Sequence, residues 1–182
     1  MAGVATVWTV GHSTRDWDDF LALLGGYGIE AVADVRRFPG SRRHPWFAGE
    51  TMARTLPAAG FDYLWLPQLG GRRRALPGSP NGAWRNAAFQ GYADHMASAE
   101  FADGLAQALE LASMHPTALM CAEAVWWRCH RRLIADLLVY RGMEVLHVLD
   151  AKPARPHALG EDARPAGDLL VYPPAQATLF GG

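Results

Sequence analysis

The chain has 182 residues, 50% of them hydrophobic and 19% charged, and its 17 basic side chains nearly balance 18 acidic ones. A chain of this size buries roughly two-thirds of its unfolded surface, so it can fold without disulfides or a structural metal, and its two cysteines exclude a disulfide scaffold. Because it has neither an apolar leader nor an apolar run near the roughly 18 residues of a spanning helix, we expect a cytoplasmic protein without membrane association.

The first third of the chain alternates between strand and helix patterns. The β-branched run of residues 6–10 predicts a strand, and the acidic start and apolar spacing of residues 16–26 predict a helix that ends at its glycine pair. Residues 31–35 predict a second strand, which leads into a loop rich in Arg, Pro and Gly. A weak helical pattern over residues 50–59 and a third strand over residues 62–69 follow.

The alternation resumes after a loop rich in Pro and Gly over residues 72–86. Periodic apolar positions predict helices there, and short apolar runs predict strands. The expected helices cover residues 89–95, 101–112 and 129–141, and the expected strands cover residues 117–121 and 144–150.

Strands that alternate with helices indicate parallel pairing. We therefore predict a single α/β domain over residues 1–150, with three layers, a mostly parallel sheet of about five strands and helices on both faces. The composition then shifts to Pro, Ala and Gly, and residues 151–182 are predicted to form an extended tail that packs on the domain or trails from it.

The basic residues are unevenly distributed. Residues 36–85 contain nine arginines but only Glu50 and Asp62 as acids, so this segment carries +7 and the rest of the chain −8. Arginine supplies a planar fork that matches phosphate or carboxylate. The segment is therefore predicted to present a positive surface to an anionic ligand.

Polar residues follow each of the first four predicted strands. In a parallel α/β sheet, ligands bind outside the carboxyl ends of the strands, so these residues are expected to meet at one site. They are Gly11, His12 and Ser13, then Asp34, Arg36 and Arg37, then Gln68, Gly70, Gly71 and Arg72, and finally Cys121 and Glu123.

The most specific segment runs from Cys121 to Asp136 as strand, loop and helix. We expect Cys129, His130, Arg131 and Arg132 in the first turn of this helix, where free amides and the helix dipole favour an anion. Such a position can also lower the pKa of Cys129 and make it reactive as a thiolate.

Five motifs follow one another along the chain: TVGHS, DVRRFPGSRRHPWF, LPQLGGRRR, WRNAAFQGYADHM and CAEAVWWRCHRRLIAD. Their order and spacing resemble the domain-of-unknown-function 488 family over residues 6–150. The resemblance implies a single α/β domain whose polar motifs gather in one groove, and it implies no particular reaction. The family's recurrent positions fall on Gly11, His12, Ser13, Asp34, Arg36, Pro39, Gly70, Gly71, Cys121, Glu123, Cys129, His130 and Arg131, whereas Trp126 and Trp127 depart from its pattern.

Our first hypothesis is an enzyme that acts on a nucleotide or nucleic acid. Glu123 is its candidate general acid or base, with partial burial expected to raise its pKa, and His12 and Asp34 are second choices. The phosphate and base would be held by arginines, stacking tryptophans and neighbouring polar groups. These substrate-binding candidates are Ser13, Arg36, Arg42, Arg43, Gly70, Gly71, Arg72, Arg73, Trp84, Arg128, His130 and Arg131, with Arg74, Trp46, Trp126 and Trp127 as further possibilities.

The second hypothesis is cysteine-dependent sulfur transfer or redox chemistry. Cys121 would be the nucleophile, or Cys121 and Cys129 would form a transient disulfide. Rhodanese-like and phosphatase-like sites place five residues between Cys and Arg, whereas six separate Cys121 from Arg128.

The third hypothesis is a module that binds nucleic acid or another anion without catalysis, although the overall charge of −1 is low for a dedicated binder. The cysteines with His12 or His130 do not have a familiar zinc spacing, so no metal is predicted. No GxGxxG or P-loop motif occurs, and no cofactor is predicted. The sequence does not specify an oligomeric state.

Overall fold

The computed structural model describes residues 5–175, and six strands form one sheet in the order β3-β2-β4-β1-β5-β6. The first five strands pair in parallel, and β6 pairs antiparallel with β5. The strands are β1 (Thr6–Gly11), β2 (Ala31–Asp34), β3 (Asp62–Trp65), β4 (Thr117–Cys121), β5 (Glu144–Val148) and β6 (Arg155–Pro156). Strands β2 and β4 are buried at every residue, as expected of central parallel strands covered on both faces.

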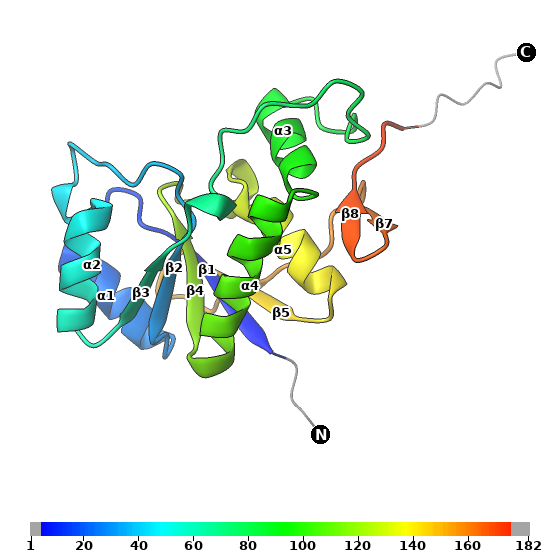
Figure 1. Ribbon diagram of the computed structural model, residues 1–182. Helices are drawn as coiled ribbons and strands as arrows, with labels where there is room; N and C mark the ends of the chain where they lie inside the picture. Colours follow the sequence, from blue (N-terminus) through cyan, green and yellow to red (C-terminus); the bar gives the residue numbers. More distant parts are fainter. Residues whose placement is uncertain (1–4, 176–182) are drawn as a thin grey trace, which may run out of the picture.

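Five α-helices cover the two faces of the sheet (Figure 1). One apolar core joins the sheet to α1 (Trp17–Gly26) and α2 (Gly49–Ala58). The other core joins its opposite face to α3 (Ala87–His95), α4 (Ala99–Met114) and α5 (Arg131–Tyr140). The predicted three-layer, mostly parallel α/β domain is confirmed.

Helix α1 ends at Gly26, within the predicted glycine pair, and the chain then turns at Gly28, whose φ of +67° is left-handed. Several other boundaries differ from the sequence prediction, and two of them have a clear local reason. Strand β3 ends at Trp65, because Pro67 has no N–H for the ladder and begins a 3-10 turn. Helix α5 begins at Arg131 rather than Cys129, whose backbone is extended at φ −126° and ψ 151°.

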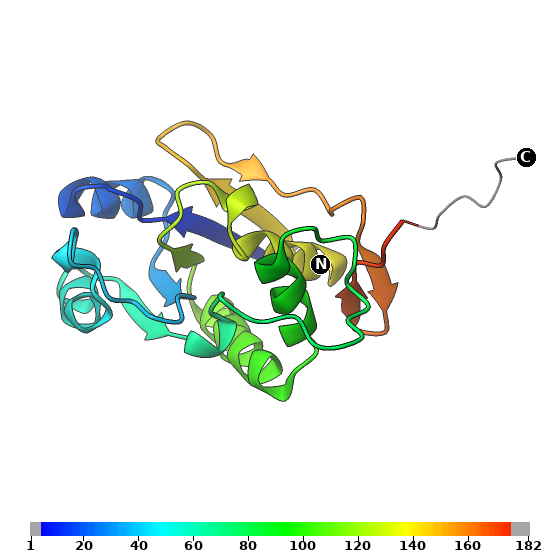
Figure 2. The same cartoon turned by 90° about the horizontal axis from the view of Figure 1, so that it is seen from above.

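The segment after residue 150 packs against the domain as far as it is described. Strand β6 extends the sheet beyond β5, and β7 (Arg164–Ala166) pairs with β8 (Leu169–Val171) as a hairpin at the end of the molecule opposite α1 and α2 (Figures 1 and 2). Asp136 of α5 accepts hydrogen bonds from buried His157 and Tyr172, which fasten this segment to the helix. The last part of the predicted tail, residues 176–182, lies outside the described residues.

No helix within residues 5–175 is both long and apolar enough to cross a bilayer.

Candidate functional site

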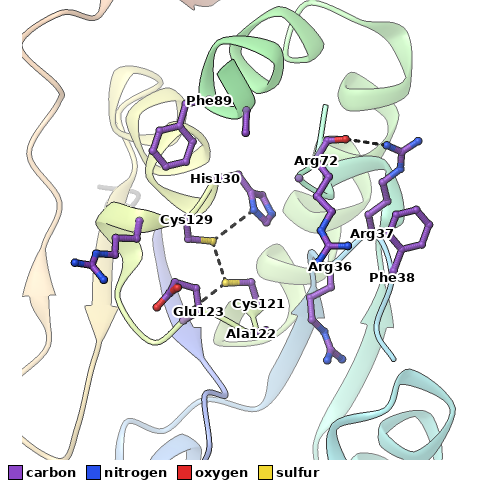
Figure 3. Close-up of a pocket in the computed structure, with 13 residues that line it drawn as sticks. Arg36, Arg37, Phe38, Arg72, Phe89, Cys121, Ala122, Glu123, Cys129 and His130 are labelled. Atoms are coloured by element: carbon purple, nitrogen blue, oxygen red, sulfur yellow. Dashed lines mark hydrogen bonds between the residues drawn. The ribbon is translucent and has the colours of Figure 1, made fainter. Parts of the chain in front are cut away.

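A pocket of about 290 Å³ lies beyond the carboxyl ends of β2 and β4. One wall consists of Cys121, Cys129 and His130, and the facing wall carries Arg36, Arg37, Phe38 and Arg72 (Figure 3). Ligand sites in open α/β sheets lie at this edge, so the position agrees with the expectation from topology.

The two cysteines lie next to each other although they are eight residues apart in the sequence. Cys121 ends β4, Cys129 precedes α5, and their Sγ atoms are 2.9 Å apart. Both are free and buried, and both line the pocket. The loop between them folds back through a 3-10 turn over Trp126–Arg128, which returns the chain to the sheet.

His130 is held in an orientation that suits a base for Cys129. Its Nε2 lies 2.9 Å from the carbonyl oxygen of Val35, which can only accept, so Nε2 carries a proton. In the neutral ring Nδ1 is then the free acceptor, and it lies 3.4 Å from Cys129 Sγ. A thiol, an imidazole nitrogen able to accept its proton and a carbonyl that orients the imidazole are therefore in contact, which is the arrangement that nucleophilic catalysis uses.

The two thiols have opposite pKa shifts. Burial acts to raise the pKa of Cys129, but hydrogen bonding from Cys121 and the adjacent His130 and Arg131 outweigh it and lower the pKa well below the ordinary value. The backbone N–H of Arg131 also points at Cys129 Sγ, at 3.5 Å. Burial and the neighbouring sulfur raise the pKa of Cys121. Both shifts favour Cys129 over Cys121 as the thiolate of the pair.

Arg131 supports this loop from inside the protein. It is 1% exposed and donates from Nη2 to the carbonyl of Glu123 and from Nη1 to Thr9 Oγ1 at 3.4 Å. Its charge therefore lies beneath the cysteines and outside the pocket, so a ligand in the pocket does not reach it. Arg131 was predicted to bind the substrate, and the structure instead buries it.

Two of the predicted glycines allow backbone segments to meet at the pocket. A Cβ on Gly70 would lie 2.6 Å from the backbone nitrogen of Arg37, and one on Gly71 would lie 3.0 Å from Nδ1 of His130. A larger residue at Gly70 would push apart the two loops that carry Arg37 and Arg72. These glycines shape the pocket without supplying a polar side chain.

Three arginine side chains remain available at the pocket. Arg72 and Arg128 are exposed, and Arg37 is half-buried with its Nη1 donating to the carbonyl of Arg72 at 3.1 Å. Phe38 is 65% exposed beside them, with the Arg37 guanidinium 5.4 Å from its ring centre. This wall offers cationic forks and one aromatic face to a ligand.

His12, Asp34 and Arg36 form a buried cluster behind the pocket. Asp34 is 0% exposed, pairs with Arg36 at 2.6 Å and accepts from the hydroxyl of Tyr63. Arg36 also donates to His12 Nε2 at 3.1 Å and to the carbonyl of Phe47 at 2.8 Å. The guanidinium of Arg36 therefore has its hydrogen-bond partners inside the protein, although the residue is among those that line the pocket.

His12 has both ring nitrogens engaged. Nδ1 donates to the carbonyl of Ser13 at 2.9 Å, and Nε2 accepts from Arg36. Burial lowers the pKa of His12 to about 4, so the ring is neutral at physiological pH. Ser13 contributes its backbone, with a φ of 51° and an N–H donated to Ala122. Neither side chain lines the pocket.

Glu123 lies at the mouth of the pocket, but its side chain is exposed. The expectation that Glu123 is partly buried is therefore wrong. The chain turns outward directly after Cys121, so Ala122 and Glu123 leave the apolar surroundings of β4.

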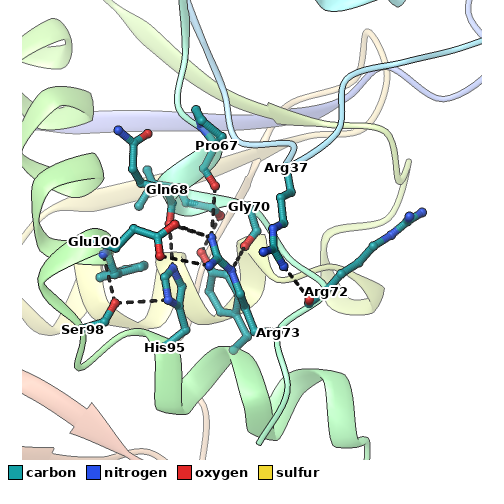
Figure 4. A network of polar contacts seen from close by, with 12 residues as sticks. Arg37, Pro67, Gln68, Gly70, Arg72, Arg73, His95, Ser98 and Glu100 are labelled. Atoms are coloured by element: carbon teal, nitrogen blue, oxygen red, sulfur yellow. Dashed lines mark hydrogen bonds and ion pairs between the residues drawn. The ribbon is translucent and has the colours of Figure 1, made fainter.

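Four other predicted ligand contacts lie outside this pocket. Arg42 and Arg43 are exposed on the loop after β2 and do not line it. Arg73 pairs with Glu100 at 3.0 Å and donates to the carbonyls of Pro67, Gln68 and Gly70 (Figure 4). Trp84 packs against the rings of Phe89 and Tyr172.

The other proposed stacking residues are also placed elsewhere. Trp126 lies parallel to the ring of His147, with 4.1 Å between ring centres, and Trp46 donates from Nε1 to the carbonyl of Arg15. Phe38 and Phe89, which line the pocket, and the carbonyl of Val35, which is the partner of His130, were not predicted from the sequence. Phe38 was identifiable as an apolar side chain within a loop, but nothing in the sequence distinguishes the carbonyl of Val35.

No group of three or more potential metal ligands occurs among the residues that the structure describes. The comparison with curated proteins and the comparison with solved structures each returned no match. The family model described as domain of unknown function DUF488 matches residues 16–138, which include both cysteines, His130 and the arginines of the pocket. Since this match covers more than half of the chain, the protein belongs to the DUF488 family.

Proposed function

We propose that this protein is a thiol-dependent redox enzyme that reduces the disulfide of a small anionic substrate. The observation that carries the proposal is the Cys129 sulfur, which lies 2.9 Å from a second thiol and 3.4 Å from His130 Nδ1 in one pocket. A low-pKa thiol next to a second cysteine is the arrangement used in thiol–disulfide exchange.

The reaction proceeds in two exchanges. The Cys129 thiolate attacks one sulfur of the substrate disulfide, which forms a mixed disulfide and releases the other half as a thiolate. The Cys121 thiol then gives up its proton, and its sulfur attacks Cys129 Sγ, which releases the second half. The substrate gains two electrons from the two cysteine sulfurs, one proton from Cys121 and a second proton from solvent, and the enzyme is left with a Cys121–Cys129 disulfide that an external dithiol must reduce.

The surroundings of the thiols favour an anionic substrate. Arg37, Arg72 and Arg128 border the pocket, and no carboxylate of the described chain forms an ion pair with any of them. Guanidinium groups bind carboxylate or phosphate through paired N–H donors. They also stabilise the thiolate that leaves in each exchange.

Trapping of the mixed disulfide tests the proposal. In Cys121→Ser the second exchange cannot occur, so oxidised glutathione should add one glutathionyl group at Cys129, detected by intact mass. Cys129→Ser is the matched control and should remain unmodified at neutral pH, because the pKa of Cys121 is raised. Failure of Cys121→Ser to form an adduct, or equal adducts in both variants, would overturn the proposal.

A second candidate is an enzyme acting on a nucleotide or nucleic acid. It is favoured by the combination of three available arginines, the exposed ring of Phe38 and the carboxylate of Glu123 in one pocket. In that case the arginines would hold phosphate and Phe38 would stack on a base. Turnover of a nucleotide that is lost in Glu123→Gln while binding is retained would support this candidate, and binding without turnover in the wild type would indicate a binding module.

A further inference from the structure

A second pocket of about 450 Å³ adjoins the first, because Arg37 and Arg72 line both. Its remaining wall comes from the segment after Gly71 and from α3 and the residues that follow it. Figure 4 shows Arg73, His95 and Ser98 on one side of this region and Arg37 and Arg72 on the other.

In the second pocket, the arginines that have no carboxylate partner outnumber the carboxylates. Arg73 is paired with Glu100, and Asp94 accepts hydrogen bonds from the N–H of Leu76, the hydroxyl of Ser79 and the amide of Asn81. Among the described residues no carboxylate pairs with Arg37, Arg72 or Arg74, and all three line this pocket. They remain able to bind an anion from outside the chain.

The loop that carries these arginines is fixed in place by backbone contacts. A Cβ on Gly91 would lie 2.3 Å from the carbonyl oxygen of Arg73, so this glycine lets the loop lie directly against α3. Arg72 has a φ of 60°, a backbone conformation that residues other than glycine rarely adopt. Its carbonyl accepts from Arg37 at 3.1 Å, which joins the two arginines shared by the pockets. Strained, over-determined backbone of this kind is concentrated at binding sites.

We propose that the second pocket binds a carboxylate of the same substrate molecule whose disulfide reaches Cys129 in the first pocket. This inference rests on the proposed function, and it specifies the substrate as a disulfide that carries a carboxylate at a distance from its sulfur atoms. Arg74 binds the carboxylate, Arg37 and Arg72 lie between the two ends of the molecule, and Arg128 serves only the pocket of the sulfur atoms.

The separate positions of Arg74 and Arg128 supply a matched pair of variants. In the Cys121→Ser background, the rate of adduct formation at Cys129 is measured by intact mass with two probes. Oxidised glutathione carries carboxylates far from sulfur, and hydroxyethyl disulfide is short and uncharged. Arg74→Gln should slow the reaction of oxidised glutathione about fivefold, the loss of one charged contact, and leave that of hydroxyethyl disulfide unchanged.

Arg128→Gln should slow both probes, because the thiolate leaving from either one is next to this side chain. Equal rates for Arg74→Gln and its parent with oxidised glutathione would overturn the assignment of the second pocket as a carboxylate site, while leaving the proposed function intact. Absence of any adduct with both probes would instead overturn the proposed function.

Binding of S-methylglutathione tests the second pocket independently of thiol chemistry. This thioether has the carboxylates of glutathione and cannot form a disulfide. Its dissociation constant, measured by NMR titration of the unmodified protein, should rise about fivefold in Arg74→Gln. No binding, or an unchanged constant in the variant, would overturn the inference whatever the cysteines do.

Discussion

Gly11 at the end of β1 lies against the backbone of Glu123, so closely that a Cβ on Gly11 would be 1.9 Å from the carbonyl oxygen of Glu123. The same carbonyl accepts from Arg131 Nη2 and lies 3.7 Å from Cys121 Sγ. The loop that joins the two cysteines is therefore held between the first strand and a buried guanidinium. The loop can occupy this position only because residue 11 is glycine and has no Cβ.

Gly11→Ala should displace this loop and separate the cysteines. Backbone atoms cannot move aside cheaply, so we expect the free energy of unfolding to fall by about 3 kcal/mol, measured by urea denaturation. Formation of the Cys121–Cys129 disulfide under oxidising buffer should also be impaired. Gly25→Ala is the control, because its Cβ would meet nothing within 4 Å and alanine favours helix α1 by up to about 1 kcal/mol. A stable Gly11→Ala variant with normal disulfide formation would contradict the predicted role of this contact.

Arg131→Met should destabilise the protein by about 3 kcal/mol. The change leaves the carbonyl of Glu123 and the hydroxyl of Thr9 without the buried guanidinium that binds them. Arg132→Met is the neighbouring control, since Arg132 only covers the ring of Trp84 at 5.0 Å, a contact of about 1 kcal/mol. Urea denaturation of the two variants measures the difference, and equal losses would show that Arg131 has no special role.

The pKa difference between the cysteines predicts the pH dependence of their alkylation. A lowered pKa keeps Cys129 ionised at pH values where an ordinary thiol is protonated, so iodoacetamide should label Cys121→Ser at neutral pH. The raised pKa of Cys121 should confine labelling of Cys129→Ser to strongly alkaline solution. The serine in Cys121→Ser can still donate a hydrogen bond to Cys129. If the two profiles coincided, the placement of the thiolate on Cys129 would be wrong.

His130→Gln should slow the reaction of Cys129 with a disulfide at pH 7 by about a hundredfold. The change removes the imidazole that accepts the thiol proton at 3.4 Å, and the charge that lowers the pKa of Cys129. Rates are measured by mass spectrometry in the Cys121→Ser background. Raising the pH should restore much of the lost rate, which separates a change in pKa from a loss of structure. An unchanged rate at pH 7 would exclude His130 as the base.

The buried histidine at position 12 predicts that stability falls in mild acid. Its folded pKa of about 4 lies below its ordinary value of 6.5, so the unfolded chain binds more protons between these values. The contribution of His12 is complete above pH 6.5 and is lost as the pH falls to 4, by about 3 kcal/mol. Urea denaturation across this range measures the slope. His12→Asn should reduce the slope, and an identical slope would contradict the assignment.

Much of the fold could be predicted because its signals are local. The runs at residues 6–10 and 117–121 are short and apolar, as buried parallel strands must be, and the structure has strands over both. The strand pair β7–β8 and the edge strand β6 were not predicted. Their residues have no apolar alternation, and they pair because the domain provides a neighbouring edge or a turn at Gly167.

The candidate site was predicted in part for a related reason. Residues directly after parallel strands must meet at one sheet edge, and Cys121 and Arg36 do lie at the pocket. The direction in which an arginine side chain points depends on which hydrogen-bond and ion-pair partners lie near it in the folded chain. Arg73 pairs with Glu100 from α4 and Arg131 donates to a carbonyl eight residues away, so both are held by partners inside the structure. Arg37 was expected at this sheet edge but was not among the substrate-binding candidates, and it lines the pocket.

By itself the sequence determined the layered α/β domain, its central strands and the sheet edge at which the polar residues after the strands meet, because hydrophobic periodicity is a local property and the order of strands and helices along the chain indicates parallel pairing. Tertiary structure alone decided that the surroundings favour the thiolate on Cys129 rather than on Cys121 and that His130 is oriented by Val35. It also decided which arginines remain free for an anion. These properties depend on distances of a few ångströms between segments far apart in the chain, since hydrogen bonding and charge interactions act over that range.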